Sequence, residues 1–411
     1  MSEQQMLKGD KAVAHGVKSI QPDVVSAYPI TPQTGMVERV SQFKADGELD
    51  GEFLRVDSEF NACSTALGAL AAGARAFSAT SSQGLKLMSE PLFTASGMRL
   101  PLVMAVANRS LSAPLSIWAD HTDTFAERDG GMIQIYAEDV QEAVDNLLMA
   151  YKVAEDPDIS LPALSTMDGF ILTHVKEPVE IYSEEEVAEF LPKREPNFTL
   201  DPSDPVTMGA YARPEHWTET RYAVQDAMFQ SKDKIDEVVH EFADRFGREY
   251  GLEHRGLIDV YGPEDADVAL ITLGSLVGTA KDVVDQYEQR GESVKLIKLR
   301  VYRPFPVDEL REALADVEAA AVLEKDVSLG FQGGLVTDLK SALYNAASRP
   351  QIRSFIVGLA GRDIRRQEIA EIVDEMQGLV EDPVSGAVAF QQEESWPQLR
   401  PDLLEGEVSD E

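Results

Sequence analysis

The sequence predicts an α/β protein with parallel sheets, divided into two domains. Three observations lead to this prediction. Short apolar strands alternate with helices from residue 7 to residue 150, the pattern breaks down between about 175 and 260, and a second alternation begins near residue 263. Such alternation is typical of a parallel sheet covered by helices on both faces. A chain of 411 residues is also too long for one small core.

Four short apolar runs predict the strands of the first domain, to which we assign residues 1–258. The strands cover residues 24–28, 53–56, 76–80 and 102–107. Helices are predicted between them at 8–20, 59–74 and 82–98. Because helical crossovers let the strands run in one direction, their carboxyl ends should meet at one edge of the sheet.

The second domain is assigned to residues 259–390. Its predicted strands cover 268–273, 294–300 and 320–324, and its predicted helices cover 279–290 and 307–314. The end of the first domain, at about 175–258, combines a proline-rich stretch with a long polar helix at 219–250, which indicates an irregular crossing segment. Residues 391–411 are expected to form an acidic tail exposed to solvent.

The charge is strongly unbalanced. Seventy-two acidic residues against 37 basic ones give a formal net charge of −35. Nucleic acid and anionic membrane surfaces need a basic face, so neither is expected as a partner. The acidic surface fits a high-salt habitat, where salt screens the self-repulsion. An acidic surface with no special habitat is the other interpretation.

Targeting signals and metal-binding patterns are missing from the sequence. No run of 18 apolar residues predicts a membrane span, and no secretory signal is visible, so a cytoplasmic location is expected. A single cysteine, Cys63, allows no disulfide within the chain and cannot supply the four thiolates of an iron–sulfur cluster. The six histidines form no zinc motif, and no metal site is predicted.

The segment Tyr28-Pro-Ile-Thr-Pro-Gln-Thr34 directly follows a predicted strand. Its prolines favour a rigid loop at the carboxyl edge of the sheet, where open α/β folds bind ligands. The hydroxyl of Thr31 would there be able to donate a hydrogen bond to a substrate carboxylate. A plain strand-to-helix turn, with Thr34 capping the next helix, is the alternative.

Glu59 and Arg109 also lie where predicted strands end. A buried carboxylate at Glu59 would need a hydrogen-bonding partner, such as a heterocycle nitrogen. The alternative is a glutamate in the first turn of a helix with access to water. Arg109 is suited to bidentate capture of a carboxylate, or else to pairing with one of the many surface acids.

The stretch Asp120-His-Thr-Asp123 places one histidine between two carboxylates. It is compatible with a metal or acid–base cluster. Because a fourth converging ligand is missing, a packed, hydrogen-bonded loop at a domain or subunit contact is the favoured interpretation.

Taken together, four segments resemble the alpha subunits of 2-oxoacid:ferredoxin oxidoreductases, and those of the pyruvate enzymes most closely. They are AYPITPQT (27–34), VDSEFNACSTALGALAAGARAFSATSSQGL (56–85), ANRSLSAPLSIWADHTDTFAERDGG (107–131) and VKLIKLRVYRPFPVDEL (294–310). The resemblance covers residues 7–375. It implies a thiamine-diphosphate-binding domain of the pyrimidine type, followed by an α/β domain similar to the C-terminal domain of transketolase.

The resemblance also implies roles for single residues. Thr31 and Arg109 fall where the family binds the substrate carboxylate. Glu59 matches the catalytic glutamate that hydrogen-bonds the aminopyrimidine of thiamine diphosphate. Further cofactor contacts are implied for Tyr28, Pro29 and Ile30. A proton shared between Glu59 and the pyrimidine would activate the cofactor, which acts as the electron sink for decarboxylation.

The resemblance further implies an enzyme made of several subunits. Mg²⁺ and the diphosphate would be bound by a beta subunit, which agrees with the absence of a diphosphate motif here. Iron–sulfur clusters, and through them ferredoxin, would belong to partner chains such as gamma and delta subunits. The reaction would be oxidative decarboxylation of pyruvate to acetyl-CoA and CO₂ with coenzyme A, or its reverse, and the chain alone would be inactive.

Three alternatives stay open. The first alternative is another substrate, since related alpha subunits act on 2-oxoglutarate, branched-chain 2-oxoacids or oxalate. A transketolase-like thiamine enzyme without ferredoxin would share the domain plan, but it would carry the diphosphate motif in this chain. A non-catalytic scaffold would be expected to lose at least one of Thr31, Glu59 and Arg109, all of which are present.

Overall fold

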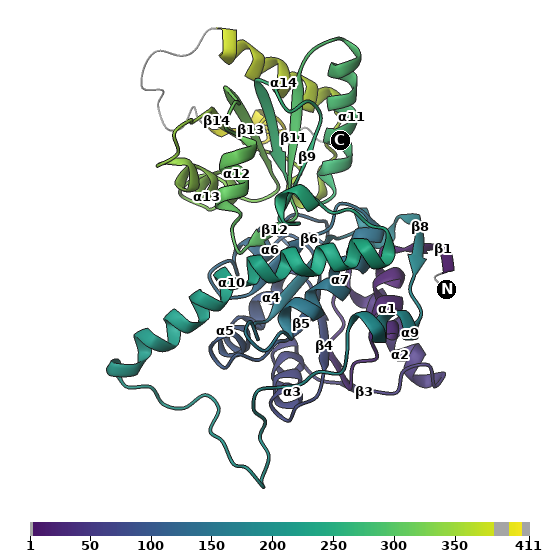
Figure 1. Ribbon diagram of the computed structural model, residues 1–411. Coiled ribbons are helices and arrows are strands. Elements are labelled where there is room, and N and C mark those ends of the chain that lie inside the picture. The colour runs from purple at the N-terminus through teal and green to yellow at the C-terminus, as the bar shows by residue number, and fades with distance from the viewer. Residues whose placement is uncertain (1–2, 382–393, 405–411) are drawn as a thin grey trace.

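Two lobes, each built on a large β-sheet, make up the chain in the computed structural model, which describes residues 3–381 and 394–404 (Figure 1). A seven-stranded sheet forms the lower lobe in this view, and a six-stranded sheet forms the upper lobe. Within the described ranges, no helix has the length and apolar character needed to cross a membrane.

The seven-stranded sheet has the strand order β12-β6-β7-β5-β4-β2-β3. Its strands are β2 (Val24–Ala27), β3 (Glu52–Arg55), β4 (Ala76–Thr80), β5 (Val103–Asn108), β6 (Ile133–Tyr136), β7 (Ala163–Asp168) and β12 (Val301–Arg303). All neighbours pair in parallel except β12, which is antiparallel to β6. The predicted parallel sheet is confirmed.

Helices cover both faces of this sheet. They are α1 (Gly9–Ile20), α2 (Thr34–Ala45), α3 (Glu59–Ala71), α4 (Ser82–Leu87), α5 (Ser89–Gly97), α6 (Thr122–Phe125), α7 (Val140–Ala154), α8 (Ile171–His174) and α9 (Glu184–Phe190). One hydrophobic core joins the sheet to α1, α2 and α7, and a separate one joins it to α3 and α5. The two cores explain why the strands are apolar on both sides.

The helix predicted at 82–98 is divided into α4 and α5 at Met88. Pro91 stands in the first turn of α5 and has no N–H to donate to the preceding turn, which favours a break there. The break lets α4 begin directly above the end of β4, at Ser82.

The six-stranded sheet of the upper lobe has the order β15-β14-β13-β10-β11-β9. Its strands are β9 (Ile258–Tyr261), β10 (Val268–Thr272), β11 (Val294–Leu299), β13 (Ala319–Glu324), β14 (Gln351–Ile356) and β15 (Glu394–Ser395). Its helices are α11 (Leu276–Gln289), α12 (Val307–Ala313), α13 (Gly334–Leu343), α14 (Arg366–Glu381) and α15 (Pro401–Leu404), with 3₁₀ turns η1 (Leu252–His254) and η2 (Leu359–Gly361). Only β9 is antiparallel to its neighbour.

The crossing segment contains more regular structure than the sequence predicts. β8 (Lys176–Ile181) pairs in antiparallel with β1 (Glu3–Lys8), and α9 follows it. The two strands form a separate two-stranded sheet and are mostly polar, so neither shows the apolar run that was used to predict strands. α10 (Pro214–Phe246) matches the predicted long helix and lies across the lower lobe in Figure 1, with its first turns projecting from it.

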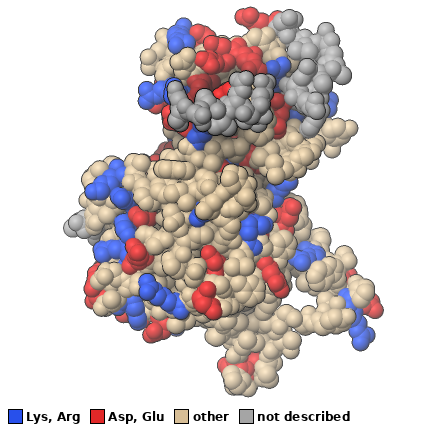
Figure 2. Space-filling model, turned by 180° about the vertical axis from the view of Figure 1, so that it is seen from behind, with Lys and Arg blue, Asp and Glu red and all other residues tan. Residues whose placement is uncertain are grey.

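The predicted domain limits at 258 and 390 remain a prediction. β12 follows the upper-lobe strand β11 in sequence but pairs with β6 of the lower sheet, so the chain crosses between the lobes there. Residue 390 and the acidic cluster at 405–411 lie outside the described residues. Seen from behind, acidic side chains gather on the upper lobe, whereas both charges are interspersed on the lower one (Figure 2).

Candidate active site

The candidate site lies at the carboxyl edge of the lower sheet, between β2 and β4. These strands are neighbours, but the helix after β2 leads outward to β3, whereas α4 and α5 after β4 lead the other way to β5. Loops that diverge in this manner leave a crevice at the strand ends, and open α/β folds bind ligands there. The Tyr28–Gln33 loop, Thr80 and the start of α4 border this crevice.

Gln33 fixes the loop that follows β2. Its side chain is fully buried; the amide nitrogen donates to the carbonyl of Ala79 (2.9 Å), and the amide oxygen accepts from the N–H of Ile30 (3.2 Å). The loop is thus tied to Ala79, the last residue but one of strand β4. Thr34 does not cap α2, which has Gln33 at its N-cap position and no side-chain cap. Sequence reasoning missed Gln33, although it stands in the motif that attracted attention.

Arg109 reaches from the end of β5 to the same loop. Its side chain is 6% exposed; Nη1 donates to the carbonyl of Thr31 (2.9 Å), and Nε donates to the carbonyl of Ser116 (2.8 Å). No acid pairs with its guanidinium among the described residues, so the alternative of a surface ion pair does not hold. Burial lowers the pKa of Arg109, but an arginine stays charged.

The structure therefore brings Thr31 and Arg109 together across 78 positions of sequence. The Thr31 side chain itself is exposed, Tyr28 and Ile30 are partly buried, and Pro29 is exposed. The Nη2 group of Arg109 has no acceptor within the described part of the chain. It is free to bind an external carboxylate.

Glu59 is the first residue of α3 and is 8% exposed. The helix is capped by the preceding Ser58, whose hydroxyl accepts from the N–H of Asn61 (3.2 Å), so Glu59 is not the cap. A methyl group at Gly84 of α4 would lie 2.8 Å from Oε1 of Glu59, which places this carboxylate against α4. No hydrogen bond to the Glu59 carboxylate occurs between described residues.

Four buried polar atoms at the carboxyl ends of β4 and β5 have no hydrogen-bond partner among the described residues, and one of the four, Thr80 Oγ1, lies close to Glu59. They are Thr80 Oγ1, Ser81 Oγ, Asn108 Oδ1 and Ser110 Oγ, all at the carboxyl ends of β4 and β5. The position of a methyl group at Gly84 would be 2.5 Å from Thr80 Oγ1, so no side chain fits there, and Thr80 and Glu59 both pack directly against the backbone of Gly84. Buried polar groups are normally satisfied, and a cluster of unsatisfied ones indicates a site for a bound molecule with its own donors and acceptors.

Asp168, at the end of β7, forms the junction between the lobes. Its carboxylate contacts Nε2 of His121 (2.6 Å) and Nζ of Lys325 (2.6 Å), and it accepts a bond from the hydroxyl of Ser275. Burial acts to raise the pKa of Asp168, but Lys325 and then His121 hold it well below its ordinary value. His121 thus belongs to a packed contact between lobes. Among the described residues, no group of acids, histidines and cysteine is arranged to hold a metal ion.

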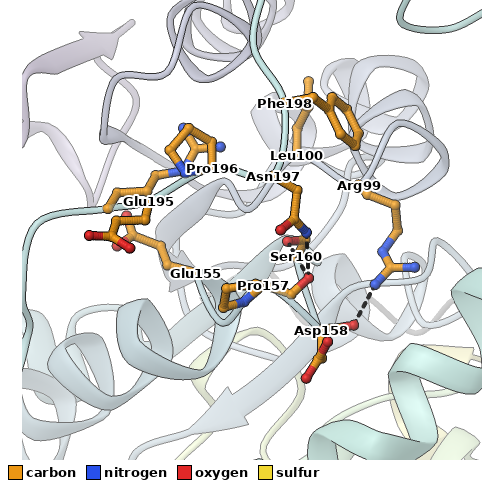
Figure 3. A pocket seen from close by; sticks show the side chains of 11 residues that line it. Arg99, Leu100, Glu155, Pro157, Asp158, Ser160, Glu195, Pro196, Asn197 and Phe198 are labelled. Atoms are coloured by element: carbon orange, nitrogen blue, oxygen red, sulfur yellow. Dashed lines mark hydrogen bonds between the residues drawn. The ribbon is translucent and has the colours of Figure 1, made fainter.

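A pocket of about 280 Å³ at the opposite end of the sheet is not a comparable site (Figure 3). Arg99 donates to the carbonyl of Asp158 (2.6 Å), Asn197 to that of Pro157 (2.8 Å), and Arg194 to that of Ala74 (2.7 Å). Each of these side chains thus contacts backbone from another segment. The side chains that line the pocket attach the crossing segment to the amino end of the sheet.

Two family models match the chain. The model described as pyruvate flavodoxin/ferredoxin oxidoreductase, thiamine diP-bdg, matches residues 15–240, and pyruvate:ferredoxin oxidoreductase core domain II matches residues 266–369. The lower lobe is therefore a thiamine-diphosphate-binding domain. This confirms the predicted order of a thiamine-diphosphate-binding domain followed by a second α/β domain.

Curated relatives match over most of their length. The pyruvate synthase subunit PorA of Methanosarcina barkeri is 48% identical over 90% of this chain and 92% of the relative. That of Pyrococcus furiosus is 47% identical over 94% of this chain and 98% of the relative. The ketoisovalerate oxidoreductase subunit VorA of Pyrococcus horikoshii is 43% identical over 92% of this chain and 94% of the relative. The chain belongs to the 2-oxoacid:ferredoxin oxidoreductase family, and within it to the pyruvate synthase PorA subunits.

A solved structure shares the fold. It is a 2-oxoglutarate:ferredoxin oxidoreductase from Magnetococcus marinus with 2-oxoglutarate, coenzyme A and succinyl-CoA bound. The two superpose with a TM-score of 0.68 at 20% identity, covering 91% of this chain and 65% of that longer chain. Membership in the PorA family makes this chain one subunit of a multi-subunit oxidoreductase, as predicted.

Proposed function

We propose that this chain supplies the pyrimidine-binding and substrate-binding half of the active site in a pyruvate:ferredoxin oxidoreductase. The observation that carries the proposal is the pair of unmet hydrogen-bonding groups at one crevice: the Glu59 carboxylate and the Nη2 group of Arg109. The first suits a ring nitrogen of thiamine diphosphate and the second suits the carboxylate of pyruvate.

The residues present fit the cofactor. Glu59 and Thr80 pack against the backbone of Gly84, which brings together one carboxylate and one hydroxyl that have no hydrogen-bond partner among the described residues. We assign Glu59 to hold and exchange a proton at the pyrimidine nitrogen, and Tyr28, Pro29 and Ile30 to line the ring. When bound, thiamine diphosphate supplies the electron sink for decarboxylation.

The substrate would be oriented by the end of β5 and the loop after β2. Arg109 would bind the pyruvate carboxylate through Nη2 while its other N–H groups stay on the carbonyls of Thr31 and Ser116. The exposed hydroxyl of Thr31 would donate to the same carboxylate. Two fixed contacts of this kind would hold the substrate in a single orientation.

The other half of the chemistry is assigned to partner subunits. Cys63 is buried, and burial raises its pKa to about 12, which disfavours the thiolate that a cluster ligand requires. We therefore assign the iron–sulfur clusters and the ferredoxin contact to gamma- and delta-type subunits. Mg²⁺ and the diphosphate are assigned to a beta subunit, and coenzyme A is the proposed acetyl acceptor.

Pyruvate is the proposed substrate because PorA relatives reach 48% identity, against 43% for a ketoisovalerate subunit. The test is the purified complex, assayed for ferredoxin reduction with pyruvate, 2-oxoisovalerate and 2-oxoglutarate in the presence of coenzyme A. We expect the highest kcat/KM for pyruvate and no reduction after thiamine diphosphate is removed. A higher kcat/KM for 2-oxoisovalerate would move the chain to the branched-chain group.

A further inference from the structure

Asp123 joins the two strand ends that carry the candidate site. Its side chain is fully buried, and each oxygen accepts two hydrogen bonds. Oδ2 accepts from the backbone N–H groups of Ser82 (3.0 Å) and Arg109 (3.0 Å). Oδ1 accepts from the side-chain amide of Asn108 (2.9 Å) and the N–H of Thr124 (2.8 Å). One carboxylate thus bridges the loop after β4 and the loop after β5.

The loop after β4 needs this bridge to keep its shape. Ser82 has a φ of 48°, in the left-handed region that disfavours a residue with a side chain. Its hydroxyl lies 2.6 Å from the carbonyl oxygen of Ser110, a second tie to the loop after β5. A strained residue persists only where its surroundings hold it, and Asp123 supplies the charged acceptor that does so.

We propose that Asp123 is the positioning residue that sets Arg109 against the Ser82 loop, and thereby fixes where the substrate carboxylate is bound relative to the cofactor. The inference rests on the proposed function, because it assumes that Arg109 binds the substrate. Asp123 touches neither substrate nor cofactor in this arrangement. It acts through the backbone of Arg109.

The four donors around Asp123 explain why a carboxylate stands there. All are N–H groups, so the ionised form accepts from every one of them, whereas a protonated form would turn an O–H toward one of these donors. Burial raises the pKa of Asp123 to about 6, and the bonds from Asn108, Arg109 and Ser82 oppose that rise. The carboxylate is thus kept ionised at neutral pH by its contacts with the site.

Asp145 on α7 provides a matched control. It too is a fully buried aspartate, and burial raises its pKa to about 7. Its partners are Gln141 (2.8 Å), the hydroxyl of Tyr250 (2.5 Å) and Nε of Arg248 (3.7 Å), away from the crevice. Loss of either aspartate should lower thermal stability, but only loss of Asp123 should affect substrate binding.

The test compares Asp123→Ala, Asp123→Asn and Asp145→Ala in the purified complex. Three quantities are measured: KM and kcat for pyruvate, the Kd of oxamate (an unreactive isostere of pyruvate) by calorimetry, and the melting temperature. For Asp123→Ala we expect KM and Kd to rise about tenfold or more, with a smaller fall in kcat, because four buried N–H groups, that of Arg109 among them, lose their acceptor. Asp145→Ala should melt earlier with unchanged KM and Kd.

Asp123→Asn keeps the shape and one oxygen for Ser82 and Arg109, while Asn108 can turn its unpartnered Oδ1 toward the new amide. Because a neutral acceptor is weaker, KM and Kd should rise about threefold. This variant decides the question if Asp123→Ala does not fold.

The outcomes separate the inference from the function it rests on. Unchanged KM and Kd in the Asp123 variants, with both raised in Arg109→Ala, would overturn the positioning role alone. Unchanged values in Arg109→Ala as well would overturn the proposed substrate site itself. A fall in melting temperature without a change in Kd would make Asp123 a structural residue like Asp145.

Discussion

The two ends of the seven-stranded sheet treat their buried polar groups in opposite ways. At the carboxyl end, the hydroxyl of Thr80 and the nearby carboxylate of Glu59 have no hydrogen-bond partner among the described residues. At the amino end, Arg99 and Arg194 donate to backbone carbonyls, although both side chains line a pocket. A cavity with charged walls is therefore no sign of a site by itself. Unmet hydrogen-bonding capacity at a switch point is the better indicator.

The largest effect should follow from Glu59→Gln, at the carboxyl end. The amide can still hydrogen-bond the pyrimidine but cannot exchange its proton, so kcat should fall by a factor on the order of 10³. Turnover of pyruvate by the purified complex measures this, with Glu90→Gln, an exposed glutamate of α5, as control. Equal turnover in both variants would remove the catalytic role from Glu59.

Arg109→Ala should lower kcat/KM for pyruvate by a factor on the order of 10², mainly through KM, because a buried charged hydrogen bond to the substrate is lost. Arg290→Ala, an exposed arginine at the end of α11, is the control. If both variants keep wild-type kinetics, another residue binds the carboxylate.

Variants at the amino end should change stability alone. Arg75, before β4, binds Glu155 through Nε (2.9 Å) and Nη2 (2.6 Å). Arg75→Ala leaves a mostly buried carboxylate unpaired, which costs about 2 kcal/mol after allowance for solvent screening. The melting temperature of the complex should fall by roughly 4 °C while kcat/KM stays unchanged. A kinetic effect would show that the two ends of the sheet are coupled.

The last prediction concerns the pH dependence of stability. Burial raises the pKa of Asp145 from 3.8 to about 7, so the folded chain binds the proton more tightly than the unfolded chain. The stability of the wild type, relative to Asp145→Asn, should therefore fall as the pH rises from about 4 to about 7 and level off above that. Melting temperatures of both proteins across this window measure the difference. Parallel curves would contradict the raised pKa.

Much of the fold followed from local pattern. The runs at 24–28, 76–80 and 102–107 lie within two residues of β2, β4 and β5. The prediction also lacked the strands β6, β7, β9 and β14. For β1, β8 and β12 the cause is clear, since they owe their strand structure to distant partners. β1 is paired with a strand about 170 positions away, and a short polar run carries no sign of such a partner. The division of the predicted helix at Met88 could have been predicted from Pro91 in the sequence.

The candidate site, like the fold, could be predicted from the sequence only in part. Residue type and position after a strand were enough to single out Thr31, Glu59 and Arg109, and the family resemblance gave them roles that remain to be tested. The supporting residues were missed, because Gln33, Gly84 and Asp123 matter only through what they touch. Gly84 matters because a Cβ there would lie 2.5 Å from Thr80 Oγ1 and 2.8 Å from Glu59 Oε1, so only glycine lets these two side chains pack together, a fact that no spacing encodes.

By itself, the sequence determined that parallel strands alternate with helices in two units, that the chain carries too few cysteines for a cluster, and that three reactive residues follow strand ends. Local periodicity and side-chain chemistry are properties of residues close together in the sequence, so they can be recognised without a structure. Only the tertiary structure decided that Arg109 reaches the carbonyl of Thr31, that the Glu59 carboxylate meets no hydrogen-bond partner in the described part of the chain, and that Asp123 ties two strand ends together. Those facts depend on chain segments that meet only when the sheet has formed.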